Sequence, residues 1–414
     1  MPISRILFAH SGGVTSVLNS TAYGVITEAR KQKCPPILIA QNGILGLIQN
    51  KIYDTTSLTQ QDLETICQTP SSVFGSCRHK LPHYQDNPKA WQSLLQICKT
   101  HHIDTIIYQG GNDSQDTSLK INEAASITHS PLRCYGIPKT IDNDLYGTDF
   151  SPGFPSCAKY LATSIREASL DTQAMSATST KVFIMEVMGR HSGWLALSTA
   201  MACENGHGPD IILLPERPVD TEEYLAKTQE VVAKKGFCIV VASEGIIHKQ
   251  TGKRFNQSNL KDAFGHHKLG GVAQELARLV QDNLRYKTHY SIPDYLQRSA
   301  GHIRASIDVS IAIQLGRAAI HACINKAPCA LLGLERTPNN QWHIIQTPLA
   351  LCANKEKTVP DNYISSCQTH ISEEGKQYFA PLIQGECYPS YDQGLPQYFD
   401  PKHLQYLQQP QHCE

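Results

Sequence analysis

The sequence predicts an α/β protein with mostly parallel sheets and more than one domain. Short apolar runs alternate with longer segments of helical periodicity along most of the chain, as in parallel α/β folds. Several apolar runs end in glycine-rich or polar clusters, and open parallel sheets bind ligands beyond the carboxyl ends of their strands. The 414 residues exceed what one small core usually holds, so two domains are expected.

The first half of the chain alternates strands and helices. Residues 5–10 form a short apolar run, and a helix is expected over residues 16–31 with Thr15 or Ser16 as its N-cap. Residues 88–101 are amphipathic and begin with proline, which suits the first turn of a helix. The other expected strands cover residues 37–40, 104–108 and 133–137, and the other expected helices cover residues 58–69 and 115–125.

The alternation continues in the second half. Apolar runs at residues 182–187, 211–214 and 236–242 predict buried strands. The tail after about Lys355 is rich in Pro, Gln and Tyr with weak periodicity, so irregular surface structure is expected there. The expected helices cover residues 154–174, 194–203, 221–234, 269–283 and 306–325, and two further strands cover residues 330–335 and 342–347.

Composition argues against several classes of protein. The 37 Lys and Arg balance the 37 Asp and Glu, so no global field would recruit nucleic acid or a membrane surface. No stretch approaches the roughly 18 consecutive apolar residues of a membrane span, and the first predicted strand starts too early for a signal peptide. The 14 cysteines form no C-x-x-C pair and no zinc-type cluster with His. Reduced, mostly buried thiols in a cytoplasmic protein are therefore expected.

Two glycine-rich turns each join a predicted strand to a predicted helix. Gly12 and Gly13 form the first, and Gly110-Gly111-Asn112-Asp113 forms the second. Such turns present backbone N–H groups and a positive helix end to a phosphate. A single turn of this kind can also be a tight connection between strand and helix that binds no ligand. Neither turn is a Walker A loop or a complete G-x-G-x-x-G fingerprint.

The segment 138–145 follows a predicted strand and carries a Lys, a Thr and two acids. Asp142 and Asp144 are two residues apart, so their side chains point the same way in an extended segment and can share one site. One could act as a base while the other holds a metal or orients its neighbour. The alternative is a strand exit in which Asp and Asn cap the next turn.

Polar clusters in the second half complement these turns. Lys181, Arg190, Glu244 and Arg298 follow or adjoin predicted apolar runs, and cations with one acid suit the phosphate and hydroxyls of a sugar phosphate. Glycine-rich turns with paired Asp suit a phosphoryl donor with Mg²⁺. Phosphoryl transfer between two domains accounts for both halves.

Six ordered motifs resemble those of the phosphofructokinase family over roughly residues 1–350. They are Gly12-Gly13 with Asn19, and the segments 110–114, 138–144, 188–191, 243–245 and 297–298. The resemblance implies two Rossmann-like three-layer α/β domains with the active site in the cleft between them. It implies a donor domain of residues 1–143 plus about 306–350, a sugar-phosphate domain of about 144–305, and a C-terminal extension of about 351–414 packed on the surface.

The resemblance also assigns roles. Asp142 is implied to be the base for the sugar 1-hydroxyl, with Asp144 supporting it, and Arg78 is implied to face the phosphoryl group in transfer. Arg78 could otherwise be a solvated surface residue. Lys139 and Thr140 complete the implied catalytic set. Implied donor contacts are Gly12, Gly13, Gly111, Asp113 and Lys139; implied sugar-phosphate contacts are Thr140, Asp142, Asp144, Lys181, Met188, Gly189, Arg190, Glu244, Tyr295 and Arg298; Asn112 and Asp113 are the implied metal residues.

Two positions indicate the pyrophosphate-dependent branch of the family. ATP-using bacterial members carry Gly where this chain has Asp113, and Gly where it has Lys139. Asp113 would occupy the space of a nucleotide α-phosphate and repel it, whereas Lys139 adds an ammonium group for pyrophosphate. The resemblance therefore implies Mg²⁺-dependent, reversible transfer from pyrophosphate to fructose 6-phosphate. Lys181 is supplied across a subunit interface in the family, which implies a dimer or tetramer.

Departures from the family pattern leave alternatives open. The first loop lacks the usual Asp and Pro-Gly, Asn112 replaces an Asp, and Lys181 stands where ATP-using relatives have Arg. An ATP-dependent 6-phosphofructokinase and a sedoheptulose-7-phosphate kinase remain alternatives. A non-catalytic sugar-phosphate-binding paralogue also remains compatible with the altered loop. A nicotinamide dehydrogenase would need the full dinucleotide fingerprint, which the chain lacks.

Overall fold

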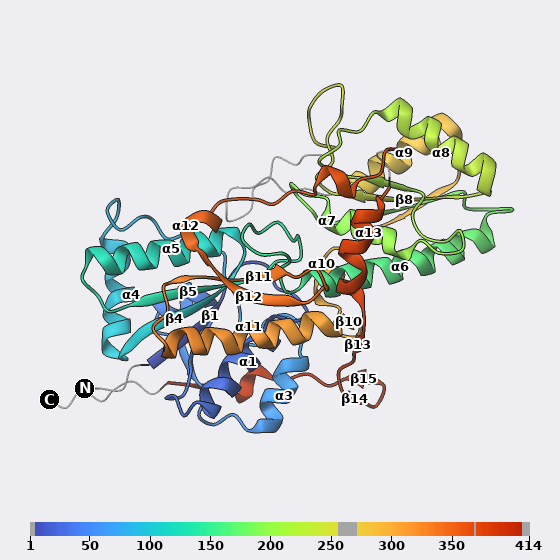
Figure 1. Cartoon of the computed structure of the whole chain (residues 1–414). Helices are drawn as coiled ribbons and strands as arrows, with labels where there is room; N and C mark the ends of the chain where they lie inside the picture. The colour runs from blue at the N-terminus through green and yellow to red at the C-terminus, as the bar shows by residue number, and fades with distance from the viewer. Residues whose placement is uncertain (1–4, 256–270, 368–369, 408–414) are drawn as a thin grey trace.

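The computed structural model describes residues 5–255, 271–367 and 370–407. Figure 1 shows two sheets, each with helices packed against it, joined by the long helix α6 (Phe154–Met175) and by the C-terminal segment. The α/β class with mostly parallel strands is confirmed.

The larger sheet has the strand order β12-β11-β5-β4-β1-β2-β3-β16. Its central strands β2, β1, β4, β5 and β11 are parallel, and the outer strands β12, β3 and β16 pair antiparallel. Their carboxyl ends therefore lie along one edge. The bounds are β1 Arg5–His10, β2 Leu38–Ala40, β3 Ile52–Asp54, β4 Ile103–Gly110, β5 Arg133–Pro138, β11 Ala330–Arg336, β12 Trp342–Pro348 and β16 Gln405–Tyr406.

Helices cover both faces of the larger sheet, and the side chains of β1, β2, β4 and β5 alternate between two apolar clusters. Phe8 of β1 packs with α1, α3 and α11, whereas Leu7 packs with α2, α4 and α5. This alternation is the two-residue period of a strand buried on both faces. The helices are α1 Leu18–Lys31, α2 Gly43–Ile48, α3 Gln60–Gln68, α4 Lys89–Thr100, α5 Asn112–Ile127, α11 Ser306–Ile324 and α12 Leu349–Cys352.

The smaller sheet is fully parallel, with the order β7-β8-β6-β9. Val182 and Ile184 of β6 pack toward α8 and α9, and Met185 and Val187 pack on the opposite face, where α6 and α7 lie. The bounds are β6 Val182–Val187, β7 Ile211–Leu213, β8 Cys238–Ser243, β9 Thr288–Ser291, α7 Trp194–Ser198, α8 Thr221–Lys235, α9 Val272–Leu284 and α10 Tyr295–Ser299.

Several predicted boundaries are wrong. Helix α1 begins at Leu18, its N-cap is Val17, and neither Thr15 nor Ser16 caps it with a side chain. Helix α5 begins at Asn112 and not at residue 115, because Gly111 supplies the extended N-cap backbone. The predicted helix over 194–203 is an α-helix only to Ser198 and continues as a 3₁₀ turn. The short elements α2, β3, β9 and α10 were not predicted, and residues 269 and 270 of one predicted helix lie outside the described residues.

The C-terminal tail departs most from expectation. Helix α13 (Glu373–Phe379) places Tyr378 and Phe379 in the same buried cluster as Trp194. Tyr406 of β16 stacks on Tyr53 at the edge of the larger sheet, with ring centroids 4.7 Å apart. Irregular surface structure was therefore the wrong prediction for these parts of the tail.

Helix α11 is the one helix in the described ranges that is long and apolar enough to cross a membrane by length and composition. It crosses α1 in direct backbone contact. A Cβ on Gly24 would lie 2.3 Å from the Ile313 carbonyl oxygen, and one on Gly316 would lie 2.3 Å from that of Thr21. These contacts are those of a core helix of the larger sheet.

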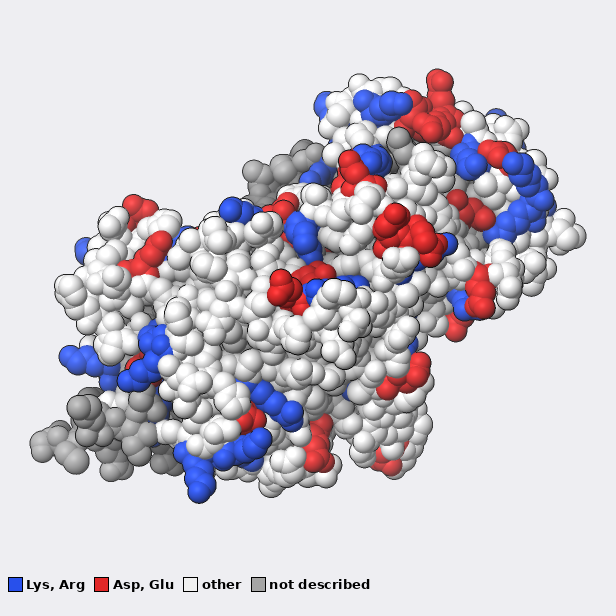
Figure 2. Space-filling view, viewed as in Figure 1, with Lys and Arg blue, Asp and Glu red and all other residues white. Residues whose placement is uncertain are grey.

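The visible surface carries no large patch of one charge sign. Figure 2 shows basic and acidic side chains interspersed over this face. The cysteines of the described residues are free thiols, and Cys98, Cys134, Cys157, Cys238 and Cys352 are the fully buried ones. Fewer are buried than the sequence analysis predicted.

Candidate active site

The loops after β1, β4 and β5 meet at the carboxyl edge of the larger sheet. The Lys139 backbone N–H donates to the Gly110 carbonyl (3.1 Å), and its ammonium group donates to the Gly13 carbonyl. A Cβ on Gly12, which has φ +77°, would lie 3.2 Å from Lys139 Nζ. The two glycine-rich turns and the Lys139 segment therefore form one site, because their parallel strands end together.

Cationic groups concentrate at this edge. A pocket of roughly 380 Å³ is lined by both Arg78 and Arg298. Burial, together with the charges of Arg78 and Arg298, lowers the pKa of Lys139 to about 7. A bound anion would offset this repulsion and keep the ammonium group protonated. The complete lining is Gly12, Gly13, Val14, Ser71, Ser72, Gly75, Ser76, Arg78, Tyr295 and Arg298.

Two carboxyl groups follow β5. Burial, then the charge of Glu244, raises the pKa of Asp142 to about 6, although Arg190 and Lys139 oppose the shift. Burial, then the charge of Asp142, raises the pKa of Asp144 to about 7. A carboxyl group whose pKa lies near neutral pH can exchange a proton with a hydroxyl group during a reaction.

The backbone turn at these acids is well defined. The Thr140 hydroxyl accepts a hydrogen bond from the Asp142 N–H (3.1 Å), and Asn143 takes a left-handed conformation with φ 53°. Asn is among the residues that tolerate this region. The Ser192 hydroxyl donates to the Asp142 backbone carbonyl (3.4 Å), so this contact does not engage the Asp142 carboxylate.

The smaller sheet contributes the loops after β6 and β8. The Met188 N–H donates to Gln297 Oε1 (3.1 Å), and the Ser243 hydroxyl donates to the Gly189 carbonyl (2.5 Å). Gly189 has φ +142°, and a Cβ there would lie 2.6 Å from the Ser192 carbonyl oxygen, so only glycine fits. Burial raises the pKa of Glu244, which follows Ser243 in the chain, and the Arg190 charge opposes this shift.

Helix α10 connects the two sets of loops. The Arg298 guanidinium lies 3.9 Å from the centroid of the Tyr295 ring. A Cβ on Gly13 would lie 3.4 Å from Arg298 Nη1, so this arginine reaches the first loop of the larger sheet. Arg298 Nε is buried without a hydrogen-bond partner in the described residues, which leaves a donor for a ligand.

Lys181 is the candidate that the chain does not bring to this site. It precedes β6, whereas Met188 and Gly189 follow it, and six strand residues separate the two ends by about 20 Å. Its ammonium group donates instead to the Ser176 carbonyl (2.5 Å). The structure therefore places Lys181 at the opposite edge of the smaller sheet.

The first turn of α5 holds the two candidate metal residues. Asn112 Oδ1 is buried and accepts no hydrogen bond from the described residues, and Asp113 is ion-paired with Lys80 (2.9 Å). The described ranges contain no group of three or more His, Cys, Asp or Glu that could hold a metal ion. A cation here would need oxygen ligands from a bound substrate as well.

The sequence analysis missed part of the pocket wall. Ser71 and Ser72 line the pocket, and the Ser72 hydroxyl hydrogen-bonds to His10 Nδ1 (2.7 Å). Burial, then the Lys139 charge, lowers the pKa of His10 to about 3, so its imidazole is neutral. These residues form no charged or glycine-rich motif, and the small-residue run before Arg78 was the sole signal nearby.

Together, the two sheets define an α/β protein in which a pocket lined by two arginines and a pair of acidic residues both act on the charge of Lys139, at the carboxyl ends of parallel strands. Residues 5–323 match the family model described as Phosphofructokinase, and the chain belongs to the phosphofructokinase family. This membership removes the dehydrogenase alternative.

Close relatives agree over nearly the full length. The chain is 44% identical to the pyrophosphate–fructose 6-phosphate 1-phosphotransferase of Xanthomonas campestris pv. campestris (strain B100), covering 98% of this chain and 97% of that protein. The Methylococcus capsulatus (strain Bath) protein of the same name is 40% identical, with 96% of each covered. The crystal structure of a pyrophosphate-dependent phosphofructokinase from Nitrosospira multiformis has a TM-score of 0.89 at 39% identity, covering 98% of this chain and 97% of that one.

Proposed function

We propose that this protein transfers a phosphoryl group from pyrophosphate to the 1-hydroxyl of fructose 6-phosphate, reversibly, giving fructose 1,6-bisphosphate and phosphate. The observation that carries the proposal is the buried Lys139, held between the Gly12-Gly13 loop and the two arginines, with Asp142 three residues further on. The names of the close relatives support the same donor and acceptor.

Donor choice rests on Lys139 and Asp113. Lys139, Arg78 and Arg298 supply the positive charge that a small, highly charged donor requires. Asp113 lies on the first turn of α5, beside the Gly110-Gly111 loop, where its charge opposes the α-phosphate of a nucleotide. Its ion pair with the half-exposed Lys80 offsets that charge only in part.

Acceptor activation is assigned to Asp142. Its carboxylate takes the proton of the sugar 1-hydroxyl as the oxygen attacks phosphorus. Burial and the charge of Asp142 raise the pKa of Asp144 to about 7, so Asp144 supports Asp142 by staying protonated while Asp142 is ionised. Arg78 and Lys139 offset charge on the phosphoryl group in transfer, and Thr140 orients the turn. We assign the remaining sugar-phosphate contacts to Met188, Gly189, Arg190, Glu244, Tyr295 and Arg298.

A divalent cation, Mg²⁺ by its preference for oxygen ligands, fits the first turn of α5. Asn112 Oδ1 is a buried oxygen without a partner in the described residues, and Asp113 adds a carboxylate. When bound, the ion would neutralise phosphate charge and orient the donor. Gly12, Gly13 and Gly111 hold the donor phosphates through backbone N–H groups.

We assign the donor half of the reaction to residues 1–143 with about 306–350, and the sugar-phosphate half to about 144–305. The two sheets and the loops at their carboxyl edges support this division. The segment of about 351–414 forms a C-terminal extension. The free thiols support a cytoplasmic location.

We propose a homo-oligomer, a dimer or tetramer, in which Lys181 reaches the sugar phosphate of a neighbouring subunit. Its distance from the site of its own chain supports this arrangement. Lys181→Ala and Asp142→Ser proteins should each be inactive, but refolding them together should restore roughly a quarter of wild-type activity. Half of random pairs are mixed, and each mixed pair has one intact site of two. Absence of recovery, with mixed oligomers shown to form, would exclude the shared site.

The direct test is an assay of the purified protein with fructose 6-phosphate and Mg²⁺, comparing pyrophosphate with ATP as the donor. Turnover with pyrophosphate and not with ATP is the expected result. Turnover with ATP alone would retain the acceptor site and reverse the donor assignment. Inactivity with both donors, while sedoheptulose 7-phosphate reacts, would change the acceptor. Binding without turnover would favour the non-catalytic paralogue.

A further inference from the structure

The turn that carries Asp142 and Asp144 is fixed by a residue from the C-terminal tail. Asn143 stands between the two acids, is fully buried, and has a left-handed backbone. Its Nδ2 donates to the Tyr378 hydroxyl (3.0 Å), and its Oδ1 accepts from the Ser151 N–H (3.1 Å). The side chain of Asn143 therefore ties the turn to two other parts of the fold.

Tyr378 is itself held firmly. Its hydroxyl donates to the Asp149 carbonyl (2.8 Å) and accepts from Asn143 Nδ2. The hydroxyl therefore uses both its donor and its acceptor capacity on the loop that follows β5. Its ring packs against Trp194 and Tyr363, with centroids 5.3 and 5.2 Å away. A buried Asn143 amide without a hydrogen-bond partner would cost folding free energy. The Tyr378 hydroxyl therefore favours the turn geometry in which the Asn143 amide reaches it.

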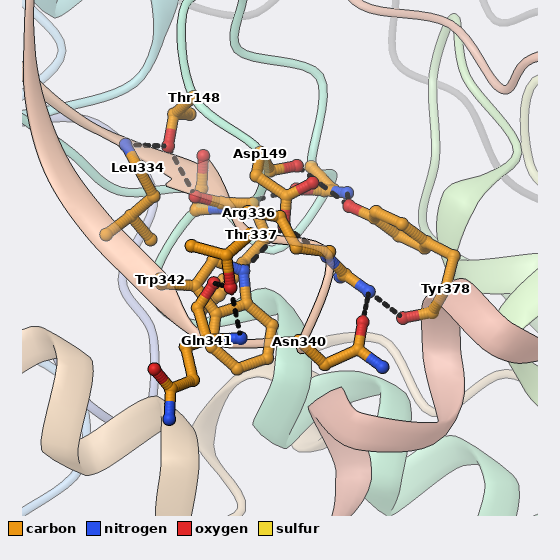
Figure 3. A network of polar contacts seen from close by, with 12 residues as sticks. Thr148, Asp149, Leu334, Arg336, Thr337, Asn340, Gln341, Trp342 and Tyr378 are labelled. Carbon is orange, nitrogen blue, oxygen red and sulfur yellow. Dashed lines mark hydrogen bonds and ion pairs between the residues drawn. The ribbon is translucent and has the colours of Figure 1, made fainter.

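Arg336, the last residue of β11, also contacts Tyr378. Figure 3 shows its guanidinium group between Asp149, Trp342 and Tyr378. Arg336 Nε donates to Asp149 Oδ2 (2.9 Å) and Nη1 donates to the Tyr378 carbonyl (3.0 Å), while the guanidinium carbon lies 4.3 Å from the centre of the Tyr378 ring. The hydroxyl position is thus set by the larger sheet as well as by α13.

Lys357 makes a second attachment from the tail. Its N–H donates to the Asp144 carbonyl (2.7 Å), and its ammonium group donates to the carbonyls of Thr148 (3.1 Å) and Asp149 (2.6 Å). The carboxylate of its neighbour Glu356 lies 2.8 Å from His191 Nδ1, and His191 follows Arg190 in the chain. The tail therefore contacts the segments after both β5 and β6.

We propose that Tyr378 is a positioning residue for phosphoryl transfer: through Asn143, its hydroxyl sets the direction in which Asp142 and Asp144 face the pocket. The inference rests on the proposed function. Reacting groups need near-attack geometry, and a displacement of about 1 Å can cost about 100-fold in rate. Tyr378 is buried and does not line the pocket, so it should act on the rate and not on binding.

Tyr378→Phe keeps the buried ring and removes only the hydroxyl. The expected result is a kcat lower by about 10- to 100-fold, with KM for both substrates within about threefold of the wild type. Tyr363→Phe is the matched control. Tyr363 packs in the same aromatic cluster, and its hydroxyl makes no hydrogen bond within the described residues. Its kcat should stay within about twofold of the wild type.

A double-mutant cycle separates positioning from a general loss of structure. In an Asp142→Ser background, Tyr378→Phe should change the residual rate by less than about twofold, because Asp142, the base whose direction it sets, is gone. An equal reduction in both backgrounds would overturn the inference, as would a wild-type kcat in Tyr378→Phe. An inactive wild-type protein in the same assay would instead contradict the proposed function, and this inference with it.

Discussion

Replacing Asp142 with serine is expected to lower kcat by about 10³-fold, because the hydroxyl of the sugar loses its proton acceptor. KM for fructose 6-phosphate should change by less than about fivefold, since Arg190 and Arg298 retain the phosphate contacts assigned to them. Steady-state kinetics with pyrophosphate as the donor measures both values. A variant with near-wild-type kcat would remove Asp142 from the role of base.

Asp308→Asn is the matched control for this substitution. Burial raises the pKa of Asp308 to about 6, as it does for Asp142. Its carboxylate, however, accepts hydrogen bonds from the N–H groups of Gly153 (2.9 Å) and Ser156 (3.1 Å) at the start of α6. This variant should lower the melting temperature and leave kcat within about threefold of the wild type. A comparable loss of kcat in both variants would indicate a structural cause.

The pH dependence provides a second signature of the base. With a pKa of about 6, Asp142 is ionised above that pH and protonated below it. Wild-type kcat/KM should therefore fall as the pH drops through about 6. The residual activity of Asp142→Ser should lack this fall when both proteins are assayed with the same substrates, so that ionisation of pyrophosphate affects both equally.

The double substitution Asp113→Gly with Lys139→Gly is expected to lower kcat/KM for pyrophosphate by about 100- to 1000-fold. Lys139 places a buried ammonium group at the first glycine-rich loop, and loss of one such donor at a phosphoryl site has an effect of about this size. Removal of Asp113 also takes away the charge that opposes a nucleotide. Activity with ATP should therefore be gained or increased.

Lys80→Ala serves as the control for the donor variants. Lys80 is half-exposed and ion-paired with Asp113, so its charge is screened by water. Its removal should change kcat/KM for pyrophosphate by less than about fivefold. Unchanged donor kinetics in the Asp113 and Lys139 double variant would overturn the assignment of both residues.

Local sequence patterns predicted the strands that form the site. The runs before Gly12, Gly110 and Lys139 are apolar and short, and the structure places all three at one edge of the larger sheet. The first turn of α5 was missed because its residues, Asn112 to Ser114, are polar and carry no helical apolar period. Tertiary contacts, and not local preference, settle such boundaries.

Long-range partners were beyond what the sequence could predict. Nothing near Tyr378 signals that its hydroxyl meets Asn143, since the surrounding tail lacks clear periodicity. The same holds for Ser72, whose hydrogen bond to His10 joins segments 62 residues apart. Pairings of this kind depend on the folded arrangement of both sheets.

The hydrogen bond between Asn143 and Tyr378 spans 235 residues. During synthesis, every strand of both sheets except the edge strand β16 can be assembled before the ribosome has released residue 378, because β12 ends at Pro348 and β16 begins at Gln405. The acidic turn would then exist without its brace, and the enzyme would gain full turnover only after α13 emerges and docks. Maturation of catalysis should therefore trail formation of the sheets, as expected for contacts of high sequence separation.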